Sequence, residues 1–121
     1  MTKLYGIQHK DTLGAALNLA GSLIDLQRFE EAKALFRKTI PVARRVLGDN
    51  DETRLKMPWH YARALYEDTG ATLDDLREAV TTIEDTVRIA RRVMGGGHPL
   101  VESIESDLER SRAALREAPH S

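Results

Sequence analysis

Histidine and carboxylate side chains are the residues of this sequence whose types and spacing could support acid–base or metal chemistry. His9 lies just before Asp11, and His98 lies in a similar context much further along the chain. His9 and His98 occupy equivalent positions of a sequence repeat, about two repeats apart. They should therefore not form one site, and we predict that each caps a helix. His60 stands between two aromatic residues. A histidine can titrate near neutral pH, but we expect His60 to line a binding groove or to pack against other side chains rather than to act in catalysis.

Signatures of an activated nucleophile or a bound cofactor are missing from the sequence. There is no cysteine, which excludes thiolate metal sites and thiol nucleophiles. There is also no Gly-x-Ser-x-Gly or His-Glu-x-x-His motif. Gly95-Gly96-Gly97 lacks the flanking strand and the Gly-Lys-Ser/Thr ending of a phosphate loop, so we interpret it as a helix stop. We therefore predict no catalytic residue, no metal and no cofactor.

The charged residues are balanced and interleaved. Eighteen Lys and Arg face nineteen Asp and Glu, for a net charge of −1. This balance argues against nucleic acid and anionic membranes as partners. The repeated pairs Arg44-Arg45 and Arg91-Arg92 are better explained by favourable placement at helix C-termini. No signal peptide and no apolar run of about 20 residues is visible, so we expect a cytoplasmic protein.

The elements that must position these residues are helices arranged as repeats. With 121 residues, 41% hydrophobic and 5% aromatic, the composition favours one all-α domain. The segment 43–48 recurs at 90–95, and a weaker echo indicates a period of about 42 residues with about five extra residues near 69–75. Apolar residues at helical spacing predict five helices, at about residues 11–26, 29–47, 51–68, 73–94 and 99–117.

Glycine, threonine and proline residues indicate where these helices start, stop or bend. Gly48 and Gly95 are typical of the residue that follows a helix C-terminus. Thr72 resembles a helix start. Pro41 and Pro58 fall inside predicted helices. Each removes a backbone amide donor, so we expect kinked helices that continue on both sides.

Three short motifs fit the loop, the first helix and the turn of one known helical repeat. They are GIQHKDT at residues 6–12, NLA at 18–20 and RFEEA at 28–32. The chain thereby resembles the 42-residue tetratricopeptide repeats of kinesin light chains. The resemblance implies an α-α superhelix of helical hairpins over residues 1–121. Repeat 1 is expected at about 11–48, repeat 2 at about 51–95, and a capping helix at about 98–117 that exposes Glu102, Glu105, Asp107, Glu109 and Arg110.

The family pattern also implies where a partner binds. The Asn of the Asn-Leu-Ala motif points into a concave groove lined by the first helix of each repeat, where it hydrogen-bonds an extended peptide. The equivalent positions here are Asn18, His60 and Asp107. The predicted groove is completed by Ser22, Lys56, Arg63 and Arg110. We hypothesise that it prefers a peptide with an acidic residue, held by Lys56 or Arg63; the alternative is that these are solvated surface charges.

The function that follows is a protein–protein interaction scaffold or adaptor that is not an enzyme. The alternative is a structural segment of a longer repeat array, or a self-associating module, without a ligand groove of its own. The N-terminal edge separates these hypotheses. An exposed apolar strip formed by Leu4, Tyr5 and Leu13 would indicate that this edge packs against a neighbour, either another repeat or a second copy of the chain.

Overall fold

The computed structural model describes residues 10–118, which form five α-helices and no strand. Each helix begins and ends within about two residues of its predicted position, which is the usual uncertainty of helix ends. The expected all-α helical-repeat fold is therefore confirmed. The helices are α2 (Lys10–Asp25), α3 (Phe29–Val46), α4 (Glu52–Tyr66), α5 (Leu73–Met94) and α6 (Pro99–Glu117).

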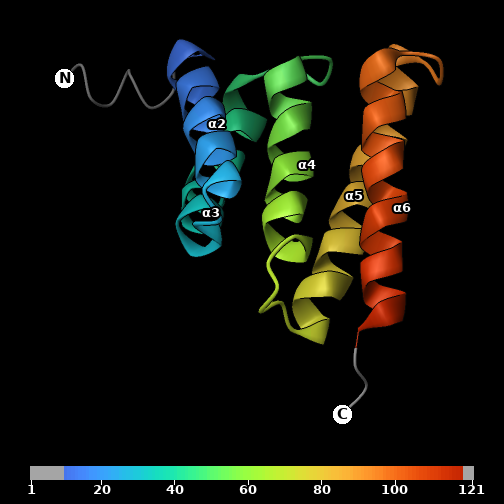
Figure 1. Cartoon of the computed structure of the whole chain (residues 1–121). Coiled ribbons are helices and arrows are strands. Elements are labelled where there is room, and N and C mark those ends of the chain that lie inside the picture. Colours follow the sequence, from blue (N-terminus) through green and yellow to red (C-terminus); the bar gives the residue numbers. More distant parts are fainter. Residues whose placement is uncertain (1–9, 119–121) are drawn as a thin grey trace.

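The helices stack as two hairpins followed by a single helix. Figure 1 shows α2, α4 and α6 side by side, with α3 and α5 behind them. Each helix packs against the next one in the chain, and α4 also contacts α2 and α6. The first helices thus line one face of the stack, as predicted. None of the helices in this described region is long and apolar enough to cross a membrane.

The core repeats with the offset of the sequence pattern. Phe36 of α3 and Ile83 of α5 are both fully buried, and so are Ala32 and Ala79 four positions before them. Small alanines let neighbouring helices approach closely, while the large residue fills the space between them. Thr39 and Thr86 repeat at the same offset, and both are buried. Each threonine hydroxyl donates a hydrogen bond within its own helix, to the carbonyl four residues earlier. The distances are 2.9 Å for Thr39 and 2.8 Å for Thr86.

The turn between α2 and α3 is built around Gln27, which has a φ of 61°. The Arg28 amide donates to the Leu23 carbonyl at 2.8 Å, and the Gln27 amide donates to the Ile24 carbonyl at 2.9 Å. This pair of bonds is the Schellman motif, in which glycine normally occupies the left-handed position. A glutamine there carries backbone strain.

The other helix ends confirm two of the three predicted signals. Thr72 accepts a hydrogen bond from the Asp75 amide at 3.1 Å, and the Asp75 carboxylate accepts from the Thr72 amide at 3.0 Å. This is a capping box. Gly95 ends α5 with a φ of 87°. The prediction for Gly48 is wrong: α3 ends at an extended Leu47, which places that side chain in the core, and Gly48 begins a turn closed by the Asp51 amide.

Pro41 and Pro58 lie inside α3 and α4, and both helices continue beyond them as predicted. Because proline has no amide hydrogen, the Arg37 and Arg54 carbonyls lack their usual donor four residues later. The two prolines line one cavity of about 280 Å³. The extra residues of the second repeat fall where they were expected, in the α4–α5 loop and the first turn of α5.

Leu13 does not contribute to an exposed edge. Its side chain is buried, with 1% of its surface accessible. The residue faces the interior because it lies on the same side of α2 as Ala20 and Ile24, which are also buried. Leu4, Tyr5 and His9 lie outside the described residues.

Candidate partner-binding groove

A cavity of about 390 Å³ lies between α4 and α6. Both helices belong to the face of the stack that the first helices form (Figure 1). One side comes from α4 and the other from α6, so its shape depends on how these helices pack. It contains four of the seven residues predicted for the groove: His60, Arg63, Asp107 and Arg110. The complete lining is Trp59, His60, Arg63, Glu67, Ser103, Ser106, Asp107 and Arg110.

The Asp107 carboxylate holds the two sides of this groove together. The Trp59 indole Nε1 donates to one Asp107 oxygen at 2.5 Å. The Arg110 guanidinium donates to the other at 3.2 Å. Asp107 is only 4% exposed, so these charge-assisted bonds take the place of solvent. Trp59 lines the groove and also packs against the hydrophobic core.

The capping helix therefore departs from its predicted pattern of exposure. Glu102, Glu109 and Arg110 are exposed as expected, but Asp107 is buried and Glu105 is half-buried. Asp107 turns toward α4 because the Trp59 indole provides a donor there. Glu105 turns toward α5, where it forms an ion pair with Arg91.

His60 is largely buried and packs against its neighbours in the groove. Its ring stacks on Trp59 with centroids 4.6 Å apart. Its Nδ1 lies 3.1 Å from the Arg63 guanidinium. Burial lowers the pKa of His60 to about 4, and the positive charges of Arg63 and Lys56 add to this effect, against a smaller opposing effect of Asp107. A neutral imidazole can accept the Arg63 hydrogen bond, which an imidazolium could not.

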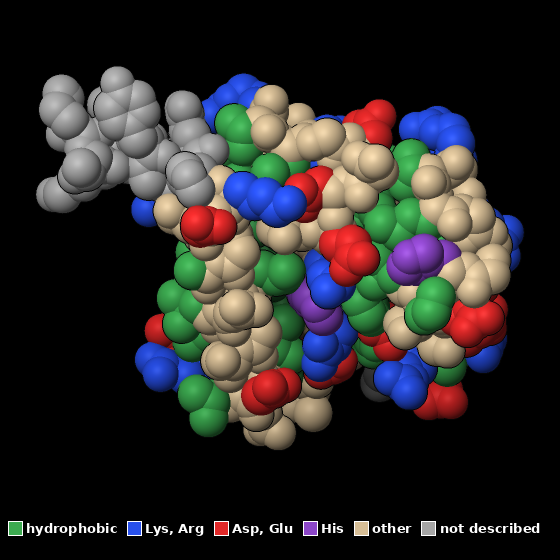
Figure 2. Space-filling view, turned by 90° about the horizontal axis from the view of Figure 1, so that it is seen from above, with side chains coloured by type: hydrophobic (Ala, Val, Ile, Leu, Met, Phe, Trp, Pro, Cys, Tyr) green, Lys and Arg blue, Asp and Glu red, His purple; other side chains and the backbone are tan. Residues whose placement is uncertain are grey.

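The groove is polar and its charges are balanced. Arg63 donates to Glu67 at 2.8 Å, and Arg110 pairs with Asp107. The Arg110 side chain is 72% exposed, compared with 24% for Arg63. Arg110 is therefore the cation most open to a partner. Figure 2 shows basic and acidic side chains interleaved across the face seen from above, without a large patch of one sign.

The other three predicted groove residues lie outside this cavity. Asn18 and Ser22 are exposed on α2. Lys56 is half-buried on α4 and lies 3.5 Å from Glu52. Asn18 occupies the repeat position of His60, one hairpin earlier. Whether these residues contact a partner stays a prediction.

Three residues that line the cavity were not among the predicted groove residues: Glu67, Ser103 and Ser106. The two serines stand at helical spacing from Asp107 and Arg110, so all four share one face of α6. Glu67 follows Arg63 by four residues, the spacing of an ion pair on a helix. These spacings were available in the sequence. What was not available was which face of α6 packs against α4.

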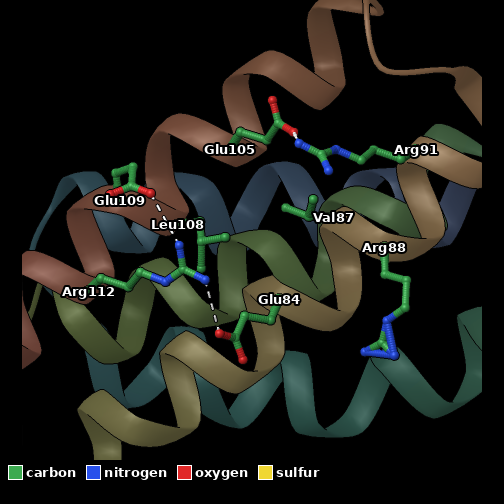
Figure 3. Close-up of a pocket in the computed structure, with 8 residues that line it drawn as sticks. All are labelled: Glu84, Val87, Arg88, Arg91, Glu105, Leu108, Glu109 and Arg112. Carbon is green, nitrogen blue, oxygen red and sulfur yellow. Dashed lines mark hydrogen bonds and ion pairs between the residues drawn. The ribbon is translucent and has the colours of Figure 1, made fainter.

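A second and larger cavity lies between α5 and α6, with a volume of about 730 Å³. Val87 and Leu108 form an apolar floor between charged side chains (Figure 3). Arg112 bridges Glu84 at 3.1 Å and Glu109 at 3.2 Å. Arg91 pairs with Glu105 across the helices. These residues pair with one another, so the cavity has no excess charge that would favour a ligand of one sign.

The remaining sequence features have structural roles. The Nδ1 of His98 accepts a hydrogen bond from the Leu100 amide at 3.0 Å, so this residue caps α6 as predicted. Arg44-Arg45 and Arg91-Arg92 lie in the last turns of α3 and α5, as predicted. Across residues 10–118, no group of three or more His, Asp or Glu side chains is placed to hold a metal ion.

Comparison with known families agrees with this geometry. Residues 12–52 match the family model of the tetratricopeptide repeat. This segment is similar to a tetratricopeptide repeat. The matched segment covers most of α2, all of α3 and the first residue of α4, and it contains the Asn-Leu-Ala and RFEEA motifs. The tetratricopeptide repeat is a non-enzymatic fold that generally mediates protein–protein interaction. Searches of curated proteins and of solved structures gave no significant match.

Proposed function

We propose that this protein is a non-enzymatic adaptor that binds a protein or peptide partner in the groove between α4 and α6. The observation that carries the proposal is the cavity of about 390 Å³ on the face formed by the first helices. It combines an aromatic residue, Trp59, with two arginines and two serines. Aromatic and arginine side chains are the residue types that most often dominate the binding energy of protein interfaces.

The polar lining suits an extended peptide, whose backbone amides and carbonyls need hydrogen-bond partners. Ser103 and Ser106 each offer a hydroxyl that can donate and accept. Arg110 is mostly exposed and is held near the groove by its ion pair with Asp107. An acidic residue of the peptide would bind Arg110, with Arg63 deeper in the groove. Lys56 lies outside the cavity and contributes charge at a distance. The proposal places this activity in the cytoplasm.

Selection from a displayed library of random peptides tests the proposal. The wild-type chain should enrich peptides that contain an acidic residue. Enrichment should be lost with Arg63→Ala and Arg110→Ala together. The matched control is Arg77→Ala, because Arg77 is exposed on α5 and pairs only locally with Asp74. Equal enrichment by the groove variant and the control, or no enrichment by the wild type, would contradict a peptide-binding groove.

A further inference from the structure

The exposed face of α2 is formed by Ala15, Leu19 and Ser22, which lie at helical spacing on one side of the helix. All three are exposed, and the Leu19 side chain shows 54% of its surface. Among residues 10–118, the exposed large hydrophobic residues are Leu19, Leu26 and Val46. The face is separate from the α4–α6 groove, because it shares no residue with the lining of that cavity.

The same three positions are buried in both of the other first helices. α2, α4 and α6 begin at Lys10, Glu52 and Pro99, so their residues correspond one by one. Each counterpart is less than one-tenth exposed. In the order of Ala15, Leu19 and Ser22, the counterparts are Met57, Tyr61 and Ala64 in α4, and Ile104, Leu108 and Ser111 in α6.

The second helix of the preceding hairpin covers these counterparts. Tyr61 packs edge-on against the Phe36 ring of α3, with centroids 6.3 Å apart. The Arg37 guanidinium lies over the same Tyr61 ring at 5.9 Å. Leu108 of α6 lies with Val87 of α5 in the space between those helices. The uncovered face of α2 is thus the continuation of an interface that the chain already uses twice.

We propose that this face of α2 is a docking surface for an amphipathic helix of the α3 type carried by another protein. Such a helix presents large apolar side chains at the spacing of Phe36 and Ile40. The three α2 residues carry no charge, so the docked helix gains its stability there from apolar contacts with Leu19. A second copy of this chain is not the expected source. The side chains that do the covering, Phe36 and Ile83, are fully buried within their own chain.

A tandem duplication tests the surface directly. A chain with residues 1–51 followed by residues 10–121 keeps the native spacing, because Lys10 then stands where Glu52 follows Asp51. The added α3 should cover the second α2 as it covers α4 in the wild type. We expect Tm to rise by about 5 °C or more, since repeat stacks gain stability from each new interface.

Substitutions at Leu19 tell docking from a general effect of added length. Leu19→Lys in the second α2 of the duplicated chain should cancel the rise in Tm, because it places a second cation beside Arg37 of the added α3, which lies over Tyr61 in the wild type. The same substitution in the first α2 should leave the rise intact, because that face stays uncovered. In the wild-type chain it should change Tm by less than about 2 °C, as is usual for exposed positions.

Several results would overturn the proposal. No rise in Tm on duplication would show that the face does not accept a helix of the α3 type. An equal rise with Leu19→Lys in either copy would show that Leu19 is not in the new interface. Light scattering of the wild-type chain should give a monomer. A dimer that Leu19→Lys dissociates would make a second copy the occupant instead.

Discussion

The hydrogen bond from Trp59 to Asp107 should stabilise the packing of α6 on α4 measurably. Trp59→Phe keeps an aromatic ring in place and removes the indole donor. The Asp107 carboxylate, 4% exposed in the wild type, would then lose its hydrogen bond from Trp59 and keep the one from Arg110. Hydrogen bonds to charged groups contribute roughly 1.5–3 kcal/mol. We therefore expect the free energy of unfolding to fall by about 2 kcal/mol and Tm by roughly 6–10 °C.

Urea denaturation followed by circular dichroism at the helix band measures this change. The control is a double-mutant cycle with Asp107→Ala. In that background the indole has no carboxylate to bind, so Trp59→Phe should lower the free energy of unfolding by less than about 1 kcal/mol. An equal loss in both backgrounds would refute the reasoning, because it would show that ring size and not the hydrogen bond determines the effect.

Three further predictions concern single residues. The pKa of His60 in the folded chain is about 4, below its ordinary value near 6.5, so the unfolded chain binds more protons between these two pH values. The free energy of unfolding should therefore fall by up to about 3 kcal/mol from pH 7 to pH 4. Urea denaturation at several pH values should show a weaker pH dependence for His60→Gln. Gln27→Gly should raise the free energy of unfolding by about 0.5–1 kcal/mol by relieving the left-handed backbone, and an unchanged or lower value in urea denaturation would contradict this. Thr72→Ala should lower it by about 1 kcal/mol through loss of the capping box, whereas Thr69→Ala in the same loop should have little effect in the same assay.

The helices could be predicted closely because their signals are local. Apolar spacing and the capping residues Thr72 and His98 act within a few turns of chain, and the recurrence of segment 43–48 at 90–95 aligns the two repeats. The buried alanines Ala32 and Ala79, and the buried residues Phe36 and Ile83, recur with the same repeat offset. Gly48 failed as a helix stop because glycine is equally suited to a following turn. The left-handed conformation of Gln27 could not be predicted, because glutamine has no preference for that conformation.

The site was harder to predict because it depends on contacts between distant residues. Asp107 looks like a surface residue in the sequence, and its burial depends on an indole 48 residues away. Leu13 and Leu19 are both apolar residues of α2, yet one is buried and the other exposed. Helical spacing places Leu13 on the side of α2 that also carries Ala20 and Ile24, but which side other helices cover depends on contacts between distant segments. The α5–α6 cavity was missed for the same reason.

The central place of α4 sets how the molecule can come apart. α4 contacts each of the other four helices of residues 10–118, whereas α2 or α6 can separate while the rest of the stack keeps its contacts. Opening that involves α4 must break every layer at once, so its amide hydrogens should exchange only through global unfolding. The ends of the array can therefore loosen independently, while the α4 side of the partner-binding groove stays rigid until the whole fold is lost.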